Sequence, residues 1–174
     1  DTVIMRIADV FYSFPFMILA ITISSIFGPS IYNTMIILGI LSWPSSARLL
    51  RAEFLKLKNT DFALAATTIG ANPSRVMFRH ILPNAISPLL VSATLGVASA
   101  ILSEAGLSFL GLGVPPPAPS WGNMLNRARP LHILASMPWM WLPPGIAIFV
   151  IVLSINFVGD GLRDAFDPRQ VMNE

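Results

Sequence analysis

Four long apolar runs constrain this 174-residue chain more than any other feature of its sequence. They cover about residues 10–27, 31–47, 85–104 and 139–158. The first run has 18 residues and no charge, and a helix needs roughly 20 residues to cross a hydrocarbon core about 30 Å thick. The sequence therefore predicts an all-α, polytopic membrane protein with four transmembrane helices in a single domain over residues 1–174.

The composition supports a membrane protein. Only 11% of the residues are charged, while 54% are hydrophobic, and soluble domains carry about 25% charged residues. The absence of cysteine excludes disulfides and thiolate metal sites. Because the chain begins at Asp1 rather than at Met, we expect it to be N-terminally incomplete, with an upstream part that could add further spans.

The basic residues predict how the chain is oriented in the membrane. Four alternating spans put nine of the 11 Lys and Arg residues on one side, six of them within residues 48–79. Only Arg127 and Arg129 fall on the other side. By the positive-inside rule, residues 48–84 and both chain ends are cytoplasmic, and the proline-rich, non-helical stretch 107–138 faces outward.

Residues 59–83 form the most distinctive polar segment. Asn59, Thr60 and Asp61 can each cap a helix start through a side-chain oxygen. Gly70 suits the left-handed position that ends a helix, and Asn72-Pro73 is a typical start of the next one. The segment therefore predicts two short helices joined at a glycine.

The first of these helices carries an apolar stripe that needs a surface to bury it. Phe62, Ala65, Ala66 and Ile69 recur at helical spacing. A cytoplasmic partner protein could accept this stripe in a groove. The surrounding basic residues alone are explained more simply, as the topology signal plus attraction to membrane lipids with anionic headgroups.

The third run carries a second pattern. Ser92, Gly96, Ala100 and Glu104 recur every four residues and so share one helix face. Small residues at this spacing let helices approach closely in lipid, and a carboxylate there needs water, a cavity or a partner. The face either lines or gates a pathway, or it is a packing face with Glu104 at the outer interface.

Signals for catalysis are poor, so we expect no enzyme. The chain has no glycine-rich phosphate loop ending in Lys-Ser or Lys-Thr, and therefore offers no nucleotide site of its own. His80 and His132 fall on opposite sides of the predicted membrane and cannot share a metal, which usually takes three or four ligands. We expect the chain itself to have no catalytic, cofactor or metal site.

The polar segment and several other stretches resemble a known family. Ala65-Ala66-Thr67-Thr68-Ile69-Gly70, followed by Leu82-Pro83, resembles the cytoplasmic loop of ATP-binding-cassette (ABC) importer permeases. Further stretches resemble the branch of that family that serves dipeptides, oligopeptides or nickel. These are residues 5–9, 78–84, 104–113, 119–125 and 159–164 with Asp167-Pro168-Arg169. Leu64 and His80 depart from the loop pattern, which has Glu and Ile there.

The resemblance implies a permease subunit of an ATP-driven peptide importer in a bacterial cytoplasmic (inner) membrane, with the type I fold and a cytoplasmic coupling helix. It implies a second, similar permease, two cytoplasmic ATPase subunits that bind the ATP and Mg²⁺, an extracytoplasmic binding protein, a peptide substrate and no nucleic acid. The implied ATPase-coupling residues are Asp61, Phe62, Ala65, Ala66, Thr67, Ile69, Gly70, Arg75, Leu82 and Pro83.

Three alternatives stay open at this point. Within the family, the substrate could be nickel or another small solute. From other classes, an ion-coupled secondary transporter or channel would need an intramembrane ion site, for which only Glu104 is available. A membrane scaffold would bind partners without substrate-dependent ATP use.

Overall fold

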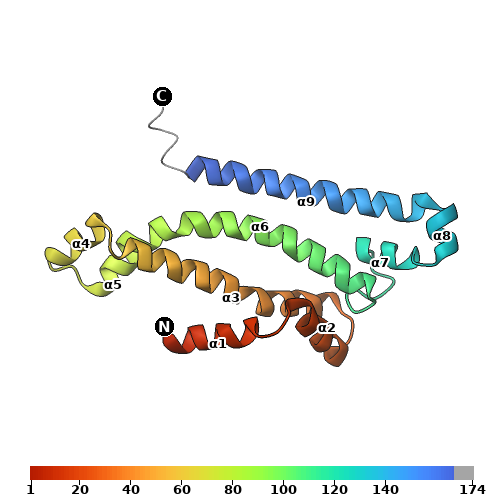
Figure 1. Ribbon diagram of the computed structural model, residues 1–174, viewed down its shortest axis with the longest axis horizontal. Coiled ribbons are helices and arrows are strands. Elements are labelled where there is room, and N and C mark those ends of the chain that lie inside the picture. Colours follow the sequence, from red (N-terminus) through yellow and green to blue (C-terminus); the bar gives the residue numbers. More distant parts are fainter. Residues whose placement is uncertain (167–174) are drawn as a thin grey trace.

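The computed structural model describes residues 1–166, and these contain helices and no strand (Figure 1). The expected Asp167-Pro168-Arg169 motif lies outside the described residues. In chain order the elements are α1 (Thr2–Tyr12), α2 (Phe16–Phe27), α3 (Ile31–Leu57), α4 (Asp61–Thr68), α5 (Pro73–Arg75), a π-helical turn η1 (Val76–Ile81), α6 (Leu82–Phe109), α7 (Trp121–Arg127), α8 (Leu131–Ser136) and α9 (Pro138–Phe166).

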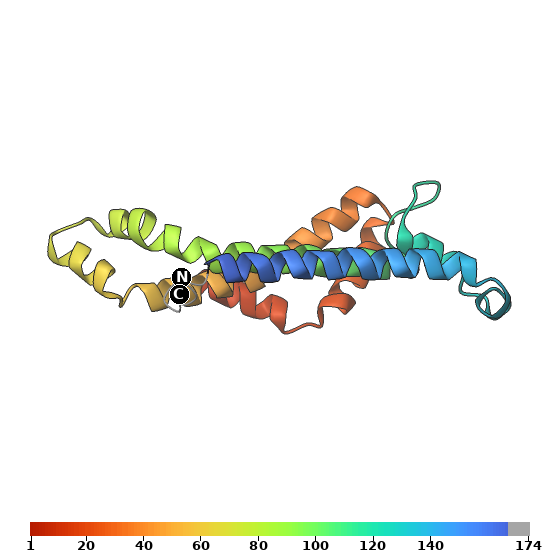
Figure 2. The ribbon, with the colours of Figure 1, turned by 90° about the horizontal axis from the view of Figure 1, so that it is seen from above.

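The molecule is long, with its three longest helices packed side by side (Figures 1 and 2). Helix α6 lies between α3 and α9, while α4 and α5 form one end and α7 and α8 the other. A buried cluster of Ala20, Ile37, Leu41 and Leu107 joins α2, α3 and α6. The N-terminus and the last turn of α9 lie in the half that carries α4.

The first apolar run is not one straight helix. Helix α1 ends at Tyr12, α2 starts at Phe16, and the two are bent by 85°. The expected span over residues 10–27 is therefore not one continuous helix. Proline disfavours the helical conformation in the residue before it and has no N–H to continue the ladder, so Pro15 divides the run.

Among the described residues, two helices are long and apolar enough to cross a membrane, or three if the bent pair counts as one span. The two are Pro73–Phe109 and Pro138–Phe166. Helix α3 is not among them, because serines and Arg48 lower the mean hydropathy of its second half. It also runs past the predicted end at residue 47 to Leu57. The structure thus supports the four-span expectation in part.

The polar segment runs into the third span without a break. Residues Pro73–Phe109 form one helix of 37 residues, in which η1 is a π-helical stretch. Pro83 lies two residues after the end of this stretch and cannot donate to the carbonyl of Arg79. The side chain of Asn84 donates to the carbonyl of His80 at 2.7 Å.

Two sequence expectations fail in the second half of the chain. The stretch 107–138 is not wholly non-helical, because α6 continues to Phe109 and α7 and α8 follow. The fourth helix does not end at the predicted residue 158, because α9 continues through Gly159-Asp160-Gly161 to Phe166. Gly159 is buried, and a Cβ there would lie 3.0 Å from Thr94 Oγ1, so this glycine serves close packing of α9 on α6.

Candidate functional site

Helix α4 is held on one face against the end of α3 and the π-helical turn η1. Ala63 and Ala66 are buried in a cluster with Val76 and Ile81. Phe54 and Leu57 of α3 pack against this cluster, together with Ala71. The small alanine side chains let α4 lie close to the π-helical turn. The cluster therefore fixes the position of α4 between the long helices α3 and α6. We call α4, α5 and η1 together the elbow.

The turn after α4 has the geometry that its sequence predicts. Gly70 has φ +82°, in the left-handed region, and the N–H of Ala71 donates to the carbonyl of Ala66 at 3.1 Å. Asn72 accepts from the N–H of Ser74 at 3.2 Å and Pro73 begins α5. The predicted start of α4 differs, because Thr60 is the N-cap but makes no side-chain cap. Its hydroxyl donates instead to the carbonyl of Leu57.

The predicted apolar stripe of α4 divides between two faces. Ala66 is buried, whereas Phe62, Ala65 and Ile69 are exposed. The side chains of Phe62 and Ile69 are 41% and 85% exposed, respectively. We call the exposed apolar residues of α4 and its C-cap the outward face of α4: Phe62, Leu64, Ala65 and Ile69. The polar residues Asp61, Thr67 and Thr68 are exposed beside them.

The other predicted coupling residues lie around the elbow. Asp61 and Thr67 are exposed on α4, Arg75 is exposed on α5, Leu82 is half-buried, and Pro83 is exposed. Within residues 1–166, Arg75 and Arg79 have no ion-pair partner, whereas Lys56 lies 3.5 Å from Glu53. The elbow therefore presents an apolar face with positive charge nearby.

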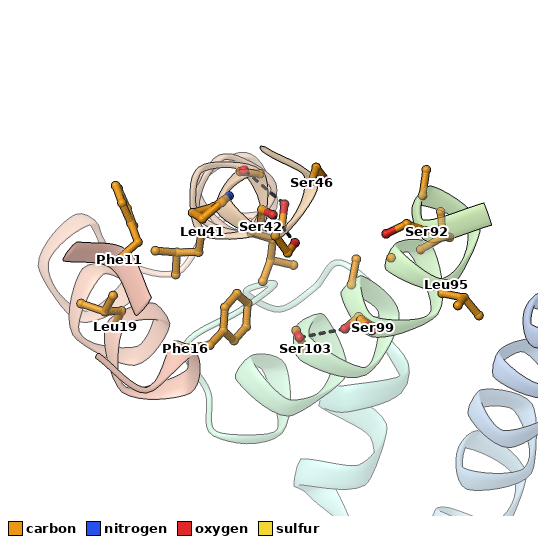
Figure 3. A pocket seen from close by; sticks show the side chains of 18 of the residues that line it. Phe11, Phe16, Leu19, Leu41, Ser42, Ser46, Ser92, Leu95, Ser99 and Ser103 are labelled. Carbon is orange, nitrogen blue, oxygen red and sulfur yellow. Dashed lines mark hydrogen bonds between the residues drawn. The ribbon is translucent and has the colours of Figure 1, made fainter. Parts of the chain in front are cut away.

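A groove of about 860 Å³ lies between the α1–α2 bend, α3 and α6 (Figure 3). Ser92, Gly96 and Ala100 line it, as do aromatic rings from residues 11–16 and serines from residues 42–46 and 92–103. None of its lining residues is acidic, basic or histidine. Glu104 is not among them.

Ion pairs fasten α1 to α3 beside this groove. Arg48 lies 2.7 Å from Asp9, and Arg51 lies 2.8 Å from Asp1. The guanidinium of Arg48 also lies 3.9 Å from the centre of the Tyr12 ring. These contacts hold the aromatic wall of the groove against α3, although each charged group is about half exposed and each pair alone contributes little.

Glu104 belongs to a hydrogen-bonded cluster at the outer end of α6. Its Oε1 accepts from the hydroxyls of Ser108 at 2.6 Å and Ser120 at 3.0 Å. The buried Ser108 hydroxyl in turn accepts from the N–H of Val114 at 3.0 Å. The side chain of Asn123 donates to the carbonyl of Val114 at 2.6 Å. We call Glu104, Ser108, Ser120 and Asn123 the outer clamp, since they join α6 to α7.

Two glycines let the backbone approach this clamp. A Cβ at Gly113 would lie 2.2 Å from Ser108 Oγ, and one at Gly122 would lie 2.3 Å from the carbonyl oxygen of Ala105. The sequence does not predict Ser108, Ser120 or Asn123 as partners of Glu104. Their only signal is the polar Ser and Asn content of residues 104–123, which does not specify pairing.

No group of three or more His, Cys, Asp or Glu side chains that could hold a metal ion occurs within residues 1–166.

Comparisons with known proteins match nearly the whole chain. A family model described as "Binding-protein-dependent transport system inner membrane component" matches residues 1–171. A protein of Brucella ovis named as a peptide permease is 52% identical over 173 residues, which are 99% of this chain and 57% of that protein.

Two further relatives cover similar shares. The dipeptide transport system permease protein DppC of Alkalihalophilus pseudofirmus is 45% identical, and the glutathione transport system permease protein GsiD of Salmonella paratyphi A is 46% identical. Each match covers 97% of this chain and 55% of the relative. The chain thus spans a little more than half the length of these relatives.

Proposed function

Because this chain belongs to the family of binding-protein-dependent transport system inner membrane components, we propose that it is the permease subunit of an ATP-driven importer for dipeptides and oligopeptides. The importer would work in a bacterial cytoplasmic membrane. Relatives named for peptide, dipeptide and glutathione transport support this substrate class.

The uncovered outward face of α4 is the observation that carries the proposal. A short helix with Phe62 and Ile69 exposed, on an elbow with Arg75 and Arg79 nearby, has the form of a helix that enters a groove of a partner. The partner would be one of two cytoplasmic ATPase subunits, which would bind the ATP and Mg²⁺.

The long helix after the elbow would carry the motion of the ATPase from α4 to the groove. When the ATPase dimer closes on ATP, α4 would move with it, and the cluster of Ala63, Ala66, Val76 and Ile81 would pass the displacement to Pro73–Phe109. Ser92, Gly96 and Ala100 lie on this same helix and line the groove. A displacement of α4 would therefore move these groove-lining residues and change the shape of the pathway.

The groove is our candidate for this chain's share of the pathway. A second permease would supply the remaining walls, and a binding protein would deliver peptide at the end that carries α7 and α8. Serine hydroxyls and aromatic rings suit a peptide. Imidazole is a suitable ligand for nickel, and the residues that line the groove offer no imidazole, carboxylate or thiolate.

Uptake by the full-length subunit, reconstituted with its partner permease, ATPases and binding protein, tests the proposal. We expect ATP-dependent accumulation of a radiolabelled dipeptide and none of radiolabelled Ni²⁺. Ni²⁺ uptake without dipeptide uptake would support the nickel importer instead. Uptake that needs an ion gradient and no ATP would support a secondary transporter, and no uptake of either solute would leave a scaffold.

A further inference from the structure

The outer clamp lies between two parts of the chain that would have different roles in transport. On one side, Ser103 precedes Glu104 directly and lines the groove. On the other side, Ser120 is the N-cap of α7, whose Trp121, Met124 and Arg127 are exposed at the end of the molecule opposite α4. Glu104 is therefore placed where a force on α7 would reach the groove.

The contacts around the clamp hold α7 close against α6. One carboxylate oxygen of Glu104 accepts from both Ser108 and Ser120, so it bonds its own helix and the start of α7 together. The side chain of Asn126 adds a bond to the carbonyl of Phe109. Gly122 lies directly against the backbone of Ala105. These contacts connect α7 to the last turns of α6.

We infer that Glu104 is a positioning residue that couples α7 to the groove face of α6. The inference rests on the proposed function, because it assumes that a substrate-loaded binding protein engages the end that carries α7. Engagement would displace α7, the clamp would pass the displacement to α6, and α6 would pass it to α4 and the ATPase. Glu104 acts through hydrogen bonds and does not touch the substrate.

The test measures ATP hydrolysis by the complete reconstituted importer, with and without peptide-loaded binding protein. In Glu104→Ala we expect stimulation by the binding protein to fall about fivefold or more, which is the range of ordinary coupling between sites. Basal hydrolysis should stay at the wild-type rate. Glu104→Gln should restore stimulation, because its amide oxygen can still accept from both hydroxyls.

Ser120→Ala provides a second variant in case Glu104→Ala fails to assemble. It removes the α7 side of the bond to Glu104 and also the hydroxyl that accepts from the N–H of Asn123. Ser136→Ala is the matched control, because the Ser136 hydroxyl bonds within its own helix, to the carbonyl of His132. The control should behave as wild type. A loss of stimulation in Ser120→Ala with basal hydrolysis kept supports the inference.

Three results would contradict it. Full stimulation in either Glu104→Ala or Ser120→Ala would exclude the coupling role. An equal loss of basal and stimulated hydrolysis would show that the clamp only maintains the fold. If the wild-type assembly itself shows no stimulation by the binding protein, the proposed function fails, and this inference fails with it.

Discussion

Two glycines illustrate opposite requirements at the scale of single residues. Gly70 has open space around it and a φ of +82°, so the backbone conformation requires glycine there. Gly122 has an ordinary φ and no space, since a Cβ would meet the carbonyl of Ala105 at 2.3 Å. Substitution should therefore strain the backbone at the first position and separate two helices at the second.

Gly70→Val should uncouple ATP hydrolysis from peptide uptake. A β-branched residue in the left-handed region costs about 1 kcal/mol or more, so the turn would rearrange and α4 would lose its fixed position. We expect uptake per ATP to fall about fivefold or more, with the amount of protein in the membrane unchanged. Gly161→Val is the control, because Gly161 lies in α9 with helical φ and open space. Normal coupling in Gly70→Val would contradict the role of this turn.

Gly122→Ala should destabilise the outer end of the molecule. The added methyl group must push α7 away from α6, and overpacking of this kind costs about 1–3 kcal/mol. The measurement is the thermal unfolding midpoint of the purified protein in detergent. Gly145→Ala adds the same methyl group in α9 with nothing within 4 Å and should not lower the midpoint. Equal midpoints for both variants would show that the close contact is unimportant.

Helix α4 shows how one short element can satisfy two requirements. Ala63 and Ala66 attach it to the molecule, while Phe62, Leu64 and Ile69 are exposed. Eight residues are too few for a stable isolated helix, so packing must maintain it. The exposed face is then a rigid surface that does not have to fold when a partner binds.

Acidic substitutions on this face should weaken binding of the ATPase. Burying one large apolar side chain contributes about 1.5–3 kcal/mol, so Phe62→Asp or Ile69→Asp should lower affinity by about tenfold or more. Co-purification of the ATPase with the permease measures this loss. Leu55→Asp is the control, since Leu55 is similarly exposed but lies on α3. Equal co-purification in all three variants would exclude the outward face of α4 as the docking surface.

The elements that local chemistry specifies could be predicted from the sequence. The helix after Thr60, the left-handed Gly70 and the cap at Asn72 follow from residue type and spacing. Other features depend on contacts. Gly159 looks like a helix breaker in sequence but is a packing residue, because its partner Thr94 lies on another helix.

At the scale of the whole molecule, one continuous helix connects the two ends. One helix of 37 residues runs from the elbow past the groove to the outer clamp. The sequence predicts its apolar span and the small-residue face of Ser92, Gly96 and Ala100. It does not predict that Glu104 accepts a hydrogen bond from Ser120 rather than lining the groove. The two residues are sixteen positions apart in the sequence, and no local rule pairs them.

Crosslinking from Thr67 tests most directly whether the elbow couples this chain to an ATPase. Thr67 is exposed on α4, and these 174 residues contain no cysteine. A single cysteine at this position in the full-length subunit would carry a cysteine-reactive photocrosslinker in native membranes, with and without ATP. We predict a specific crosslink to an ATPase subunit whose yield changes with ATP. Free labelling of this cysteine from the cytoplasm, with no crosslink to any ATPase in either condition, would contradict the account.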